Sequence, residues 1–360
     1  MGVDPAAMRR CHVAVDLGAS RTRIHLKNHG LAVDEPSLAA VDTRTGSLVA
    51  VGSVAARMVG RTPDHIRVAR PIASGTVVDA ELAQSMLRHL MSRRLAPIWR
   101  LPSTMRAIVG VPHDSGPLTR RAATLAMQGL GIKRVELVDV PVAAAVGCGL
   151  TVDVPEAAMV VVVGAATSQI AVLSLGAVVA STIVHVGGDA IEHAITEHLL
   201  SRHGVILPNG AVRDIYLRLS GAEAQPMAVT GKDVGSGLAR NVAIDAGGVR
   251  DLIGTPLAAL IDGITGVLRR SPPDLVVDLA DRGIILTGGG ALIPGLDDLV
   301  RSATGMPVHV ADDPHLRVVM GLAKLAEGRG AARTPKDPEP SRVDIGEQPV
   351  GEPDEFAPVA

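Results

Sequence analysis

The first strongly patterned segment of this chain reads HVAVDLGASRTRIHL over residues 12–26. An apolar run leads to Asp16, a glycine-containing turn follows, and a second apolar run ends at Leu26. This pattern predicts two β-strands joined by a tight turn. Backbone N–H groups in such a turn can converge on phosphate oxygens, and small residues such as Gly18 let a ligand approach the backbone closely.

The same layout returns half a chain later. Residues 159–175 read MVVVVGAATSQIAVLSL, again a strand, a glycine turn and a second strand. Two copies of one hairpin predict two related lobes. A third glycine turn, in RGIILTGGG at residues 282–290, also follows a hydrophobic strand. One such turn is a weak signal, but three in this order indicate a phosphate-binding cleft.

Between these turns, helical and strand patterns alternate, which predicts a layered α/β architecture. We expect helices at residues 80–94, 118–130 and 291–303, and strands at 106–111, 135–138 and 283–287. The chain has 360 residues, more than a typical single domain, so two lobes also agree with its length.

The composition excludes several classes of protein. A net charge of −2 argues against a nucleic-acid surface, which needs dense Lys and Arg. Cys11 and Cys148 have no metal-ligand spacing and imply no disulfide framework, which fits a reducing cytoplasm. Residues 157–184 carry no charge and are long enough to span a bilayer. Their glycines and β-branched residues instead favour three buried strands.

A longer set of short motifs resembles the bacterial actin-like MreB family of rod-shape-determining proteins. They are VDLG at residues 15–18 with Thr22, DEPS at 34–37, AVG at 50–52, MVGRTP at 58–63, RP at 70–71, GVP at 110–112, RRA at 120–122, Pro141 with AAA at 143–145, AVLSLG at 171–176, GD at 188–189 and RGIILTGGG at 282–290. These motifs extend from about His12 to Leu325 without a large gap.

The resemblance implies an actin-like ATPase fold of two lobes, each with an inner α/β subdomain and a smaller outer one. The first lobe would cover residues 1–150, with its outer subdomain at about 30–72. The second would cover 151–310, with its outer subdomain at about 189–245, and a helix within 311–328 would return to the first lobe. Residues 329–360 are rich in proline and acids, which predicts a disordered tail.

The resemblance also implies that ATP, with Mg²⁺, would lie in the cleft between the lobes. The residues assigned to it are Asp16, Gly18, Ala19, Ser20 and Arg21, then Gly164, Ala165, Ala166 and Thr167, and finally Gly288, Gly289, Gly290 and Ala291. Asp16 is the remaining carboxylate for a metal shell. Arg21 replaces a neutral residue of the family and would either contact phosphate or neutralise Asp16.

The second loop departs from the family pattern Asp–Ile–Gly–Gly–Gly–Thr–Thr. Val162 replaces the metal-shell aspartate, and Ala165 and Ala166 add methyl groups where backbone would meet phosphate. The family's water-orienting glutamate falls at Thr119, and a second glutamate becomes Val140, with Asp139 one position earlier. Losing one positioned acid–base group costs about 10²–10⁴ in rate. We therefore expect impaired hydrolysis, and the sequence leaves ATP binding open.

A second departure concerns the nucleoside. The family's Glu-x-x-Lys contact to the nucleoside aligns with Arg213 and Tyr216. A membrane contact is also implied, because an apolar loop of the family's first lobe touches the membrane and Ile98 and Trp99 fall near that position. The alternative is that Trp99 fills a gap in its own lobe.

The leading hypothesis is an MreB-like cytoskeletal scaffold or filament subunit for cell-shape and wall-synthesis control. It would lie in the cytoplasm at the inner face of the membrane. Its partners would be copies of itself or a paralogous filament, the membrane surface and cell-wall morphogenesis proteins. The alternatives are an active ATP-dependent polymerising homologue, or another actin-fold ATPase of the chaperone or sugar-kinase type.

Overall fold

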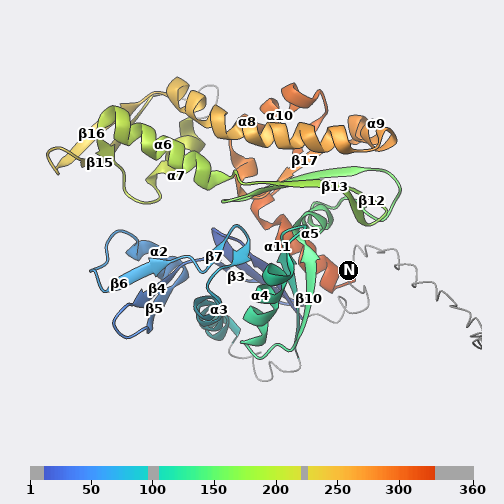
Figure 1. The fold of residues 1–360 in the computed structure, drawn as a ribbon, viewed down its shortest axis with the longest axis horizontal. Helices are drawn as coiled ribbons and strands as arrows, with labels where there is room; N and C mark the ends of the chain where they lie inside the picture. The colour runs from blue at the N-terminus through green and yellow to red at the C-terminus, as the bar shows by residue number, and fades with distance from the viewer. Residues whose placement is uncertain (1–11, 96–104, 220–225, 329–360) are drawn as a thin grey trace, which may run out of the picture.

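The computed structural model describes residues 12–95, 105–219 and 226–328, which form two lobes (Figure 1). Residues of both lobes line a cleft. The inner sheet of the first lobe has the strand order β10-β9-β1-β2-β3. Its strands are β1 (Val13–Leu17), β2 (Arg21–Leu26), β3 (Gly30–Pro36), β9 (Arg106–Val111) and β10 (Arg134–Asp139). β1 lies at the centre, antiparallel to β2 and parallel to β9.

The inner sheet of the second lobe repeats this plan with the order β13-β12-β11-β17-β18. Its strands are β11 (Ala158–Val163), β12 (Ser168–Ser174), β13 (Ala177–Val184), β17 (Ile284–Thr287) and β18 (Val308–Val310). The central β11 is antiparallel to β12 and parallel to β17. The two predicted hairpins are confirmed as equivalent. Asp16 pairs with Arg23 and Val162 pairs with Gln169, at positions 146 residues apart in each case.

Each lobe carries a smaller outer sheet. In the first lobe it is β5-β4-β6, made of β4 (Ala39–Asp42), β5 (Leu48–Val51) and β6 (Ile66–Ala69), with α2 (Gly52–Met58) against it. In the second lobe it is β14-β15-β16, made of β14 (Val205–Ile206), β15 (Met227–Asp233) and β16 (Ala239–Ile244). α6 (Gly188–His203) and α7 (Ala211–Leu219) pack beside it.

The outer subdomain of the first lobe begins later than the resemblance implied. Residues 30–36, which we placed in it, form β3, whose residues pair with β2 at the edge of the inner sheet. A short hairpin of β7 (Ile72–Ala73) and β8 (Thr76–Val77) lies just past the opposite limit. The error arose because the resemblance does not show which strand the residues after Gly30 pair with.

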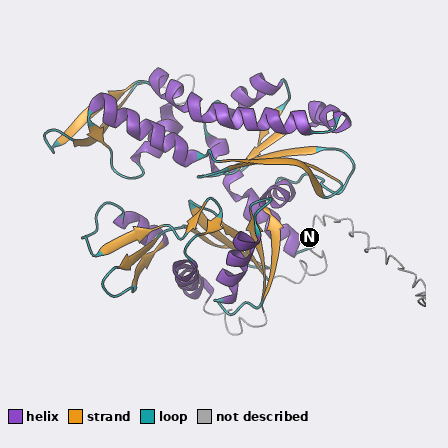
Figure 2. Cartoon of the chain, viewed as in Figure 1, coloured by secondary structure: helices purple, strands orange, loops and turns teal. Residues whose placement is uncertain are grey.

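Helices cover both inner sheets (Figure 2). α3 (Ala80–Leu95) and α4 (Pro117–Gln128) pack on the first lobe, where Met86, Leu87 and Met127 are fully buried. α8 (Ala246–Arg270), α9 (Pro273–Arg282) and α10 (Leu296–Thr304) pack on the second. Apart from Tyr216 in the second lobe, aliphatic side chains and methionines fill both cores, as expected of a chain with one Trp, one Tyr and one Phe.

Two small-residue helices join the lobes. α5 (Val140–Gly147) follows β10, and α11 (Arg317–Ala326), preceded by the 3₁₀ turn η3 (Pro314–Leu316), packs against it and against β1, β2 and β9. Gly321 lies so close to the Ala143 backbone that a Cβ there would overlap its carbonyl group, and Gly147 meets the Arg317 backbone in the same way. Side chains from both inner sheets share this core, including Ala14 and Leu173.

The uncharged segment at residues 157–184 forms β11, β12 and β13, as predicted. Within the described residues, the helix that is long and apolar enough to cross a membrane is instead Gly247–Arg270, within α8. Its mean hydropathy is 1.4, and 28% of its apolar window is buried. Ile253, Leu257, Leu260 and Ile264 recur at helical spacing and belong to the core of the second lobe. That face gives α8 a place as a core helix of its lobe.

One predicted helix is broken. We expected residues 291–303 to be helical with Pro294 in the first turn. The chain instead makes a 3₁₀ turn, η2 (Gly289–Leu292), and α10 begins at Leu296 after Gly295, whose φ of +81° is left-handed. Pro294 therefore stands between two helices. The tail at residues 329–360 lies outside the described residues.

Candidate functional site

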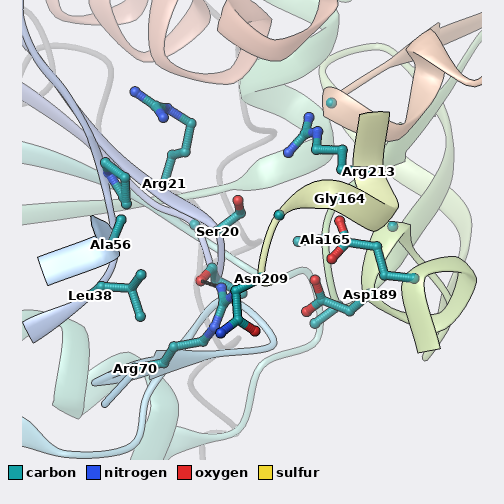
Figure 3. Close-up of a pocket in the computed structure, with 18 of the residues that line it drawn as sticks. Ser20, Arg21, Leu38, Ala56, Arg70, Gly164, Ala165, Asp189, Asn209 and Arg213 are labelled. Atoms are coloured by element: carbon teal, nitrogen blue, oxygen red, sulfur yellow. Dashed lines mark hydrogen bonds between the residues drawn. The ribbon is translucent and has the colours of Figure 1, made fainter. Parts of the chain in front are cut away.

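A cleft of about 1520 Å³ opens between the lobes, and the three glycine turns meet in it. Every residue that we assigned to the nucleotide lines it except Ala291, which is 3% exposed and packs in the core of the second lobe. Ala291 was assigned as part of a loop, but in the 3₁₀ turn its methyl group points away from the cleft. Figure 3 shows Ser20, Gly164 and Ala165 together at the centre of this cleft.

The first loop connects β1 to β2 and is held from behind by Ser37. The buried Ser37 hydroxyl donates to the Gly18 carbonyl oxygen at 2.6 Å and lies 2.9 Å from the Thr22 hydroxyl. The Ser37 amide also donates to the Ser20 carbonyl oxygen at 2.9 Å. A Cβ at Gly18 would lie 2.6 Å from the Arg21 carbonyl oxygen. The turn is thus too tight for a side chain at Gly18, and Ser37 binds the carbonyl oxygens of Gly18 and Ser20.

Asp34 on β3 bears on one of the two roles considered for Arg21, the neutralisation of Asp16. The Arg21 Nε lies 2.6 Å from Asp34 Oδ1, and its Nη2 donates to the Asp34 carbonyl oxygen at 2.6 Å. Asp16 is instead approached by Arg23, whose Nη1 lies 3.6 Å from Asp16 Oδ2. Arg23 Nε also lies 3.2 Å from Asp34 Oδ1. Arg21 therefore does not neutralise Asp16, because the neighbouring arginine does.

Burial raises the pKa of Asp16, and the positive charge of Arg23 acts in the opposite direction. Burial makes the ionised form of a carboxyl costly, and Arg23 offsets part of that cost. The Asp16 carboxylate thus already has a cationic partner within the protein.

The second loop connects β11 to β12 and mirrors the first. A Cβ at Gly164 would lie 2.8 Å from the Thr167 carbonyl oxygen, and the Gly164 amide donates to that oxygen at 2.9 Å. The start of α6 holds the loop from behind. The Gly188 amide donates to the Gly164 carbonyl oxygen at 3.1 Å, and the Asp189 amide donates to that of Ala165 at 2.8 Å. Two of the free amides at this helix N-terminus are therefore used inside the protein.

The third loop follows β17 and lies against the second. Gly288 has a φ of +85°, which a residue with a side chain adopts only with strain. A Cβ at Gly288 or Gly290 would also overlap Val163. The Gly288 amide and the Thr287 hydroxyl both donate to the Pro314 carbonyl oxygen at 2.9 Å. All three loops thus have small residues facing the cleft and a buried brace behind them.

The residues of the cleft do not fit a Mg²⁺ shell. Val162, at the position equivalent to Asp16, is 6% exposed and presents methyl groups to the cleft. Asp16 is paired with Arg23. Among the described residues, no group of three or more His, Cys, Asp or Glu side chains could hold a metal ion. Mg²⁺ needs oxygen ligands, and the two equivalent metal-shell positions, Asp16 and Val162, offer it one carboxylate, which is already paired. The other carboxylates that line the cleft, Asp189 and Glu192, lie on α6 in its far wall.

The positions expected for water-orienting acids carry none. Thr119 lies in the first turn of α4 and is not among the residues that line the cleft, whereas Val140 lines it. Asp139 bonds His113 Nδ1 at 2.8 Å and Arg120 Nη2 at 3.2 Å. Its carboxylate is therefore satisfied within the first lobe and is not a substitute for the glutamate that Val140 replaces.

His113 connects the lobes beside the cleft. Its backbone amide donates to Gln169 Oε1 on β12 at 3.1 Å, a hydrogen bond from the first lobe to the second. The hydrogen bond to Asp139 raises the pKa of His113, although burial lowers it. Sequence reasoning did not single out either His113 or Gln169, because their pairing depends on how the two lobes meet.

The far wall of the cleft comes from α6 and α7. Asp189, Glu192, Arg213 and Tyr216 line it. Burial raises the pKa of Glu192, as does the charge of Asp189, whereas Arg213 and Arg70 lower it. Arg213 and Tyr216 are the positions aligned with the family's nucleoside contact, and both line the cleft. The side chain of Arg213 extends toward the loops beside Gly164 (Figure 3).

Cations outnumber carboxylates around the cleft, which sequence reasoning missed. Seven cationic side chains line it, against three carboxylates. The cations are Arg21, Arg23, Arg57, Arg61, Arg70, Arg213 and Lys232, and the carboxylates are Asp16, Asp189 and Glu192. Arg70 Nη1 donates to the Ala19 carbonyl oxygen at 2.9 Å. The excess could not be read from a chain whose net charge is −2, because it gathers residues from both lobes.

Known proteins match this chain over nearly its whole length. The family model for the MreB/Mbl protein matches residues 10–334. The cell shape-determining protein MreB of Escherichia coli (strain K12) is 34% identical over 323 residues, covering 88% of this chain and 93% of its own. The cell shape-determining protein Mbl of Bacillus subtilis (strain 168) is 33% identical over 319 residues, covering 88% and 95%.

Solved structures give the same fold. MreB 5 of Spiroplasma citri bound to AMPPNP superposes with a TM-score of 0.81 and 27% identity, covering 86% of this chain and 93% of that one. The ADP-bound form of that protein also gives 0.81, at 26% identity, covering 86% and 94%. The MamK double helical filament gives 0.72 at 18% identity, covering 88% and 98%, a likeness of fold alone.

Proposed function

This chain belongs to the MreB/Mbl family, and we propose that it is a self-assembling cytoskeletal protein that binds nucleotide in its cleft with little or no hydrolysis. The cytoskeletal role in cell shape follows from the family, whose relatives are cell shape-determining proteins that match this chain almost from end to end. The relative that binds AMPPNP and ADP supports nucleotide binding here.

The observation that carries nucleotide binding is the junction of the three braced glycine loops. Each loop leaves backbone and small residues facing the cleft, and cations outnumber carboxylates there. Such a lining suits a nucleotide polyphosphate. The residues that would hold it are Gly18, Ala19 and Ser20, then Gly164 to Thr167, and Gly288 to Gly290. When bound, the nucleotide would supply a link between the lobes, because these loops come from both.

Weak hydrolysis is proposed because no free carboxylate stands where the reaction would need one. Val162 and Val140 present methyl groups to the cleft, and Asp139 is bonded to His113 and Arg120. Hydrolysis in this fold needs groups that orient the attacking water and stabilise the developing charge. In this proposal the chain keeps the loops that hold a nucleotide but lacks the carboxylates that would hydrolyse it.

Membrane and cell-wall partners are part of the proposal and rest on the sequence. Ile98 and Trp99 lie outside the described residues and remain the predicted membrane contact. We propose a cytoplasmic protein held at the inner face of the membrane, where it would organise wall-synthesis proteins. A vesicle co-sedimentation assay of the full chain against the Trp99→Ala variant tests this part. Equal vesicle binding by the two proteins would contradict it.

Assembly is the decisive test of the proposed function. The purified chain, alone and with a paralogous filament protein from its own cell, is examined by sedimentation and negative-stain electron microscopy with ATP, ADP and no nucleotide. We expect ordered filaments, alone or with the paralogue, and phosphate release near background. A chain that stays monomeric in every mixture would refute the cytoskeletal proposal. Filaments with rapid phosphate release, abolished by Asp16→Ala, would establish the active ATPase alternative.

A further inference from the structure

The cleft has a charge pattern that differs from that of a metal-dependent nucleotide site. A polyphosphate that binds with Mg²⁺ needs a carboxylate to hold the ion's hydration shell, and the ion then neutralises the phosphates. Here one such position is Val162 and the other, Asp16, is paired with Arg23. The seven cations against three carboxylates supply the missing positive charge from the protein itself.

The ion pairs of these seven cations show which of them are available to bind a phosphate. Arg21 and Arg23 are bonded to Asp34 and Asp16, and Arg70 is bonded to a loop carbonyl. Arg57, Arg61, Arg213 and Lys232 have no carboxylate within ion-pair distance in the described parts of both lobes. A guanidinium or ammonium left without a partner in a cleft is available to an anion.

Arg213 is the one of these cations that is seen beside a glycine loop. Its Nη2 lies 3.8 Å from the point that a Cβ on Gly289 would occupy, so the guanidinium stands directly beside the third loop. The absence of a side chain at Gly289 leaves the approach open. Guanidinium groups bind phosphate through two parallel N–H donors, at any pH at which the protein is folded.

We propose that this cleft binds ATP as the metal-free anion, with Arg213 on α7 supplying positive charge that Mg²⁺ supplies elsewhere. The inference rests on the proposed nucleotide site and specifies its chemistry. It also accounts for the replacement of the metal-shell aspartate by Val162, because a carboxylate there would repel a polyphosphate that brings no cation. Nucleotide then acts as a structural ligand that links the lobes.

The test is a calorimetric titration of ATP into the purified full chain, once with excess Mg²⁺ and once with excess EDTA. We expect dissociation constants that agree within about threefold. Arg213→Gln removes a charge-assisted hydrogen bond, so ATP binding in EDTA should weaken by about ten- to hundredfold. Arg218→Gln is the matched control, because Arg218 is an exposed arginine on the same helix and does not line the cleft. Its affinity should equal that of the wild type.

A second variant restores the carboxylate that the metal-dependent site would need. Val162→Asp places a carboxylate at the end of β11 and should make binding depend on Mg²⁺, with weaker binding in EDTA than in the wild type. Because residue 162 is buried, circular dichroism is used to check that this variant folds. If it does not fold, the Arg213→Gln comparison decides alone.

The outcomes separate this inference from the proposed function. Binding that requires Mg²⁺ would overturn the inference and leave the nucleotide site intact. Equal affinities of Arg213→Gln and Arg218→Gln would overturn the role of Arg213. No binding under either condition would overturn both the inference and the nucleotide part of the proposed function, while the filament assay would still report on assembly.

Discussion

Replacing Gly321 by alanine tests whether the crossing of α5 and α11 fixes how the lobes are joined. A Cβ there would lie 2.6 Å from the carbonyl carbon of Ala143 and 2.8 Å from the amide nitrogen of Gly147. The Ala143 carbonyl oxygen lies closer still and would be overlapped. Carbon atoms in contact prefer about 3.5–4.0 Å, so the helices would have to separate by at least about 1 Å. The obstacles are backbone atoms, which no rotamer change can move aside.

The magnitude follows from two opposing effects. Over-packing a close contact costs about 1–3 kcal/mol, and the rigid backbone here favours the upper end. Alanine in place of glycine within a helix gains about 1 kcal/mol. We therefore expect Gly321→Ala to lower the free energy of unfolding by about 2 kcal/mol, a difference between these two quantities.

The matched control is Gly266→Ala in α8, the same substitution in another helix. The nearest atom that its Cβ would meet is the flexible end of Arg270, at 3.5 Å, an ordinary contact. This variant should gain about 1 kcal/mol from helix propensity alone. Urea unfolding, followed by circular dichroism, measures both. If Gly321→Ala were as stable as Gly266→Ala, the close crossing of α5 and α11 would be wrong.

Three further changes test the braces around the cleft. Ser37→Ala removes a buried hydroxyl that bonds the first loop and should cost about 1–3 kcal/mol, against almost nothing for the exposed Ser201→Ala, as thermal unfolding of each would show. The raised pKa of His113 means that its protonated form stabilises the fold. Its contribution to stability should be complete below a pH of about 6.5 and lost as the pH rises through the raised pKa. Melting temperatures measured over a series of pH values should therefore vary less with pH in His113→Gln than in the wild type. The same pH profile in both proteins would contradict this. Asp34 pairs with two arginines at 28% exposure, so Asp34→Ala should cost about 1–3 kcal/mol in urea unfolding. The exposed ion pair of Asp298, at 73%, should contribute under about 1 kcal/mol, and equal losses from the two alanine variants would disprove the ranking.

The two halves of the cleft show how a duplicated backbone can diverge in chemistry. Asp16 and Val162 are the second-to-last residues of the central strands of their sheets, and each is followed two residues later by a glycine in the turn. The backbone pairing is the same on both sides. The side chains differ, so one half keeps a carboxylate and the other presents methyl groups. Retention of the loops with loss of the acid is the pattern expected of a nucleotide site used for binding more than for turnover.

The amino-acid sequence by itself determined the local features of this protein. Strands, turns and most helices follow from hydrophobic period and glycine placement, which act over a few residues, so both hairpins and the α/β layers were predictable. The replacement at Val162 was also readable, because Gly164 and the strand after it fix the register. The break at Pro294 was missed because proline at the start of a helix and proline between two helices look alike in a sequence.

Only the tertiary structure decided which charges meet. Arg21 could have neutralised Asp16, and the pairing of β2 with β3 brings it to Asp34 instead. Asp139 lies one position before the lost glutamate in the sequence, and only the structure shows that His113 and Arg120 bond it. The cationic residues that line the cleft lie as far as 211 positions apart in the sequence, from Arg21 to Lys232, in a chain that is slightly acidic overall. Electrostatic interactions depend on the distance between charges in space, and that distance is set only when the chain has folded.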